Sequence, residues 1–63
     1  MKFNYEGRVL EYVGEPGLLE PGETVYCFVQ EAHQFRVQTR RLVLGVNQLI
    51  FPNKSKDKFK VIQ

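Results

Sequence analysis

The sequence lacks the residues with which small domains are usually cross-linked. Among its 63 residues, Cys27 is the only cysteine, His33 the only histidine and Asp57 the only aspartate, and tryptophan is absent. One cysteine excludes an internal disulfide, and one cysteine with one histidine cannot supply the ligands of a zinc site. We therefore expect no metal and no cofactor, so that packing or oligomerisation has to stabilise the fold.

Catalytic motifs are also missing. Cys27 alternates with Val25 and Val29, as a buried strand residue does, and His33 falls in an expected hairpin loop without a catalytic partner. The glutamates are scattered, and the glycine spacing fits neither a dinucleotide-binding motif nor a phosphate-binding loop. We expect a protein that is not an enzyme and that has no small-molecule substrate.

Long apolar runs are absent as well. No run approaches the roughly 20 residues that span a bilayer. No basic segment precedes an apolar stretch near the N-terminus, as it would in a secretory signal. Together with the lone cysteine, these features predict a cytoplasmic protein without a membrane partner.

Acidic residues are scarce in the second half of the chain. All six glutamates lie at or before position 31, whereas seven of the nine basic residues follow it. The first 31 residues therefore carry a charge of −4 (two basic against six acidic), and the rest carry +6 (seven basic against one acidic). The net charge of +2 hides this asymmetry, which indicates an electrostatic partner.

What the sequence does contain is alternation of apolar and polar residues. Hydrophobic residues make up 43% of the chain and aromatic residues 13%, enough for one folded domain over residues 1–63. The alternation has the period of β-strands, and helical periodicity is nearly absent. Glu-Pro-Gly occurs at 15–17 and at 20–22, and both copies predict turns. We expect strands at 2–13, 25–30, 34–40, 41–44, 48–51 and 59–63. A polar connection is expected at 53–58, and a tight turn at 45–47, where Asn47 can adopt a left-handed φ.

The segments 25–30 and 34–40 predict a hairpin whose loop is 31–33. Its register pairs three sets of core residues, which are Val25 with Thr39, Cys27 with Val37, and Val29 with Phe35. On the opposite face it pairs Tyr26 with Gln38 and Phe28 with Arg36.

Antiparallel strands with short loops in so short a chain predict an all-β fold, a small five- to six-stranded antiparallel barrel. An SH3-like barrel is the expected form. The alternatives are an OB-like barrel and a twisted sheet that dimerises.

The non-core face of this hairpin is the candidate binding site. Aromatic rings, arginines and amides are the groups with which β-barrel proteins stack on bases, contact phosphates and read base edges. The lysines at 54, 56, 58 and 60 form a second basic feature, and their side chains would project to one side of an extended chain. The candidate residues are Tyr26, Phe28, Arg36, Gln38, Arg40, Arg41, Lys54, Lys56 and Lys58.

These residues predict a binding module for an acidic partner, either nucleic acid or an acidic protein surface. One alternative is a protein-interaction module, such as an accessory or inhibitor protein of a phage or mobile element, that covers a site on a larger protein. Another is a homodimer in which acidic and basic ends meet. In a purely structural interpretation, Tyr26 and Phe28 are covered by another part of the barrel or by a second subunit, and Arg36 stacks on Phe28.

Overall fold

The computed structural model describes residues 3–63 and is all-β apart from one short 3-10 helix, which confirms the expected fold class. Lys2, at the start of the first expected strand, lies outside the described residues. The elements in chain order are β1 (Arg8–Tyr12), β2 (Thr24–Gln30), β3 (Gln34–Val43), β4 (Val46–Pro52), the 3-10 helix η1 (Asn53–Lys58) and β5 (Phe59–Val61).

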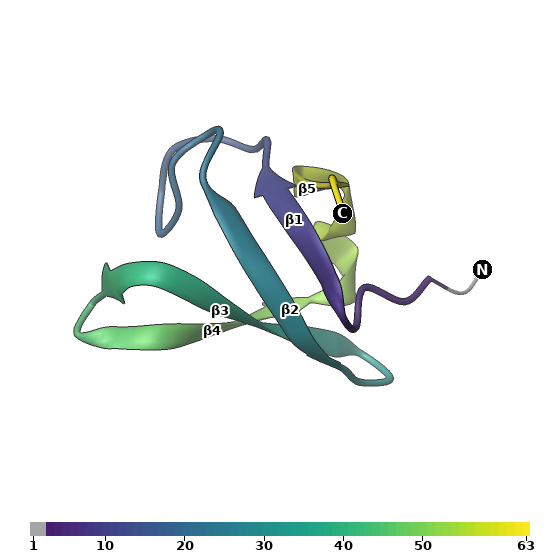
Figure 1. The fold of residues 1–63 in the computed structure, drawn as a ribbon. Coiled ribbons are helices and arrows are strands. Elements are labelled where there is room, and N and C mark those ends of the chain that lie inside the picture. Colours follow the sequence, from purple (N-terminus) through teal and green to yellow (C-terminus); the bar gives the residue numbers. More distant parts are fainter. Residues whose placement is uncertain (1–2) are drawn as a thin grey trace.

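The strands form one antiparallel sheet in the order β4-β3-β2-β1-β5. The β3–β4 hairpin runs across the direction of β1 and β2, so the sheet is strongly bent (Figure 1). This bend brings the inner side chains of all five strands together around one core.

The expected closed barrel is not formed, because β4 and β5 are the two edges of the sheet and do not pair with each other. Helix η1 separates them, Pro52 at the end of β4 has no N–H to donate, and β5 has only three residues. Side chains fill the space between the edges instead. The ring centroids of Phe51 and Phe59 are 5.1 Å apart.

The core is centred on Phe35, which is fully buried. Four rings surround it with centroids between 5.3 and 6.3 Å away, those of Phe3, Tyr5, Phe51 and Phe59. The remaining core consists of the alternate residues of the strands together with Leu19, which reaches in from the 13–23 loop.

The first strand is shorter than the expected 2–13. Strand β1 begins at Arg8, after a turn in which Gly7 has a φ of +79°. The alternation of Phe3 and Tyr5 is real, but these residues pack as rings against Phe35 without joining the sheet. Alternation alone therefore identified the buried side chains and not the backbone pairing.

The β2–β3 register agrees with the expected one for Val25 with Thr39, Tyr26 with Gln38, and Cys27 with Val37. It then shifts at a β-bulge after Cys27. Beyond the bulge, Val29 lies opposite Arg36 and Gln30 lies opposite Phe35, so the predicted pairs Val29–Phe35 and Phe28–Arg36 are wrong. A bulge places one extra residue in a strand and reverses the alternation that follows.

Residues 41–44 do not form a separate strand. Strand β3 continues to Val43, and the turn to β4 is Leu44–Gly45, with φ values of +53° and +81°. Asn47, expected to be in this turn, belongs to β4. Between Gln38 and Val43, β3 contains four residues where β4 contains only Asn47, so β3 arches away from its neighbour.

Candidate binding face

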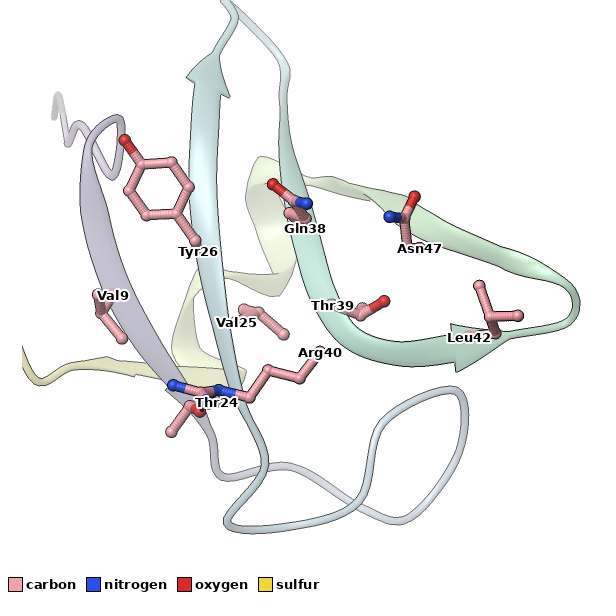
Figure 2. Close-up of a pocket in the computed structure, with 9 residues that line it drawn as sticks. All are labelled: Val9, Thr24, Val25, Tyr26, Gln38, Thr39, Arg40, Leu42 and Asn47. Atoms are coloured by element: carbon pink, nitrogen blue, oxygen red, sulfur yellow. Dashed lines mark hydrogen bonds between the residues drawn. The ribbon is translucent and has the colours of Figure 1, made fainter.

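The outer face of the bent sheet carries an open hollow of about 570 Å³ where β3 arches away from β4. Figure 2 shows Tyr26 standing on β2 at one side of this hollow and Leu42 and Asn47 on the hairpin at the other. The lining residues are Val9, Thr24, Val25, Tyr26, Gln38, Thr39, Arg40, Leu42 and Asn47.

Three of the predicted site residues meet here, namely Tyr26, Gln38 and Arg40. Strand pairing sets Tyr26 between Val9 of β1 and Gln38 of β3, and Gln38 in turn lies opposite Gln48 of β4. These residues therefore form one row across four strands. Tyr26 is 45% exposed, so no other part of residues 3–63 covers this ring.

Arg40 extends along the rim of the hollow. Its Nε donates a hydrogen bond of 3.1 Å to Oγ1 of Thr24, and the residue is exposed. Figure 2 shows the side chain reaching from β3 toward Thr24 on β2. The hydrogen bond orients the guanidinium, and no carboxylate of residues 3–63 forms a salt bridge with it.

Arg36 and Phe28 do not line the hollow. Both are partly buried beside the bulge of β2. The Nε of Arg36 lies 3.8 Å from the Glu31 carboxylate, too far for a hydrogen bond, and this nitrogen is buried without a hydrogen-bond partner among the described residues. The bulge thus divides the predicted face into two parts.

Arg41 is a structural residue. Its guanidinium binds the Glu23 carboxylate at 2.8 Å and donates a 3.1 Å hydrogen bond to the backbone oxygen of Leu18. The hydrogen bond that Arg41 donates to the Glu23 carboxylate lowers the pKa of Glu23 and raises the pKa of Arg41 itself. Arg41 therefore fastens the acidic 13–23 loop to β3, and its charge is already neutralised.

The sequence predicted that the lysines at 54, 56 and 58 project to one side of an extended chain, and the structure differs from this prediction. They belong to η1, and a 3-10 helix with three residues per turn points positions two apart in different directions. Lys56 pairs with Asp57 at 3.3 Å, and its backbone oxygen accepts a hydrogen bond from the Tyr5 hydroxyl. Lys58 lines a second, smaller hollow beside the 13–23 loop, and Lys54 is exposed. None of them lines the hollow that contains Tyr26.

Two residues with reactive side chains lie away from this face. Cys27 is fully buried, and burial raises the pKa of its thiol. His33 is exposed in the β2–β3 loop. In residues 3–63, no three histidine, cysteine, aspartate or glutamate side chains are grouped as metal ligands would be.

Several residues that line the hollow were not predicted as site residues from the sequence, above all Leu42 and Asn47. The alternation of β3 continues through Gln38, Arg40 and Leu42, and this signal could have identified Leu42 if the strand had not been divided at Arg41. Asn47 could not have been found this way, because it was expected in a turn.

Comparisons with protein-family models, with curated proteins and with solved structures found no match. Among the described residues, no helix has the length and hydropathy needed to cross a bilayer. The outer face and its hollow therefore have to be interpreted from their own chemistry.

Proposed function

We propose that this protein is a non-enzymatic binding module for an acidic partner, with single-stranded nucleic acid as the favoured one, and that the hollow around Tyr26 is its site. The observation that carries this proposal is the half-exposed Tyr26 ring beside the amide of Gln38 and the guanidinium of Arg40. Stacking on an aromatic ring contributes about 1–3 kcal/mol per base.

The composition of the hollow supports a single-stranded ligand over a duplex. A base that leaves the stack can lie on Tyr26, while Gln38 and Asn47 offer donors and acceptors to its edge. Arg40 is the one cation in the lining, so we expect the hollow to make a single ionic contact with a phosphate of the ligand. For single strands, each such contact adds about 0.7 to the slope of log affinity against log salt. We therefore expect a shallow salt dependence.

Fluorescence anisotropy with short labelled DNA and RNA oligonucleotides tests this proposal. Tyr26→Ala should weaken binding by about 5- to 150-fold, the equivalent of one lost stacking interaction. Arg40→Ala should reduce the salt slope by about 0.7. Lys54→Ala removes the same charge from η1 and is the matched control, for which we expect no change. If neither Tyr26→Ala nor Arg40→Ala alters affinity, or if no oligonucleotide binds at low salt, the proposal is wrong.

A second candidate is a protein-interaction module, such as an accessory or inhibitor protein of a phage or mobile element. The observation that favours it is the apolar tip of the β3–β4 hairpin, where Leu42 is 67% and Leu44 is 85% exposed. Capture of partners from a lysate treated with nuclease distinguishes the candidates. A protein partner survives the treatment and is lost with Leu44→Asn, whereas a partner held by nucleic acid disappears.

We also propose that the bent sheet is an opened form of the small SH3-like barrel. The pairing of β1 with β5, the short loops and the contact of Phe51 with Phe59 support this assignment. An experimental structure in which β4 and β5 pair through their backbones would assign a closed barrel, and one without the β1–β5 pair would contradict the SH3-like form.

A further inference from the structure

The two edges of the sheet differ in how they are protected. Edge strands expose unpaired backbone groups, and proteins usually protect them with charged residues, short strands or covering segments. Strand β5 has only three residues, one of which is Lys60, and follows η1 directly. Strand β4 has seven residues, none of them charged, and within residues 3–63 it pairs only with β3. The β4 edge therefore lacks the usual charged protection.

The hydrogen-bond pattern shows which groups of β4 are free. The N–H of Asn53 donates to the oxygen of His33, which makes Gln34 and Pro52 a pair without hydrogen bonds between them. Such pairs alternate with hydrogen-bonded ones along an antiparallel ladder. Phe51 and Leu49 are thus bonded to β3, and the N–H and C=O groups of Gln48 and Ile50 point outward from the sheet edge.

The side chains next to this edge are unusually apolar for a surface. Ile50 is 53% exposed, and Val46 at the start of β4 is exposed too. The nearby arginines Arg36 and Arg41 lie beside Glu31 and Glu23. Apart from Arg40, which extends along the rim of the hollow, the hairpin therefore presents little uncompensated charge of either sign.

We propose that β4 is a dimerisation edge, on which a second copy of this chain places its own β4 in antiparallel orientation about a two-fold axis at Leu49. Gln48 then lies opposite Ile50 of the second copy, and the outward groups of both residues form four hydrogen bonds across the axis. Val46 lies opposite Pro52 of the second copy, so apolar side chains cover one another.

A second copy fits this edge better than a charged partner does. Because β4 has no charged residue, self-pairing brings no like charges together, and an acidic or basic partner would find nothing to pair with. A two-fold interface also requires a self-complementary surface, which the outward groups of Gln48 and Ile50 provide. A standard interface covers about 800 Å² per copy, roughly a fifth of the 4298 Å² surface of this molecule.

The pairing also has a geometric consequence. The outer face of one sheet continues directly into that of the other, because Gln48 and Ile50 both belong to this face. The row from Val9 through Tyr26, Gln38 and Gln48 then continues into Ile50 and Arg36 of the second copy, and the symmetry-related row runs beside it, two residues away along the strands.

Sedimentation velocity without nucleic acid tests this proposal, with protein concentrations from the micromolar to the millimolar range. We expect a monomer–dimer equilibrium that high salt does not weaken, since backbone pairing and apolar contact hold the dimer. Ile50→Lys should raise the dissociation constant at least about tenfold, because two lysines then lie diagonally across the axis. Ile62→Lys is the matched control. Ile62 is an isoleucine that is 45% exposed beside the other edge, and its substitution should leave the dimer intact.

Hydrogen exchange by NMR on the unmodified protein provides a second measurement that does not depend on a variant. The amides of Gln48 and Ile50 should be unprotected in dilute solution and protected in concentrated solution. A monomer at all concentrations would overturn the proposal. So would a dimer that high salt dissociates and Ile50→Lys leaves intact, or a dimer in which both amides remain unprotected.

Discussion

Phe35 is the residue on which the core depends most, because four rings contact it from three separate segments of the chain. Phe35→Ala should lower the free energy of unfolding by about 3–5 kcal/mol. A chain of this length has a total of roughly 3–9 kcal/mol, so the variant should lose at least about a third of its stability. Urea unfolding followed by circular dichroism measures the loss. Phe28→Ala removes the same ring from a half-buried position and should cost clearly less, so equal losses would contradict the central role of Phe35.

The reactivity of the Cys27 thiol provides a second test at the scale of single residues. Burial raises the pKa of its thiol, so little thiolate is present at neutral pH, and the side chain is fully buried. A disulfide reagent should therefore react with Cys27 only as fast as the protein unfolds, and urea should accelerate the reaction. Rapid reaction of the native protein would show that β2 opens more easily than its core position implies.

At the level of elements, the β3–β4 turn combines two unfavourable features in Leu44. Its φ of +53° is one that side chains other than glycine, asparagine and aspartate rarely adopt, and 85% of the residue is exposed. Asn-Gly is the preferred pair for a two-residue hairpin turn of this kind. Leu44→Asn should thus raise the free energy of unfolding by about 1 kcal/mol. Leu42→Asn is the control, since Leu42 is exposed within the strand, and it should not stabilise the protein. A loss of stability in Leu44→Asn would show that the leucine side chain makes a contact whose stabilisation exceeds the free-energy cost of the positive φ.

The strands also show which parts of the fold could be predicted from the alternation of apolar and polar residues. Alternation identified β2, the first half of β3 and their core residues correctly, because one face of each strand is buried. It failed at the bulge after Cys27 and at the arch between Gln38 and Val43, because neither contains a glycine or proline that would mark the irregularity. The alternation predicted one face with five site residues. The structure brings Tyr26, Gln38 and Arg40 together, whereas the bulge separates Phe28 and Arg36 from them.

For the molecule as a whole, the separation of charge along the sequence is partly cancelled by folding. Glu23 pairs with Arg41, Glu31 lies beside Arg36, and Asp57 pairs with Lys56. In the first two of these pairs, a carboxylate from the acidic half meets an arginine from the basic half. The sequence could not predict this result, because it depends on where the 13–23 loop lies against β3.

The Glu23–Arg41 pair makes stability depend on pH. The pKa of Glu23 is lower in the folded protein, so the pair stabilises the fold above the unfolded-state pKa, and this contribution disappears as the pH falls through the folded-state pKa. Glu23→Gln should therefore be less stable than the wild type at neutral pH, and the difference should shrink in acid. Urea midpoints over a pH series measure it. Glu15→Gln removes the same charge from an exposed position of the loop that forms no salt bridge among the described residues, and this control should be about as stable as the wild type at neutral pH.

The pairing of the first strand with the last also constrains how the chain reaches this structure. Arg8 and Gln63 are 55 positions apart and are joined by a hydrogen bond, whereas β2, β3 and β4 follow one another through short turns. The hairpins can form from local contacts, but β1 must wait for a partner from the far end of the chain, and closing so long a loop is slow. On a ribosome, the sheet cannot be completed until β5 has left the exit tunnel. Until then the unpaired edge of β1 and the rings around Phe35 are available to other nascent chains.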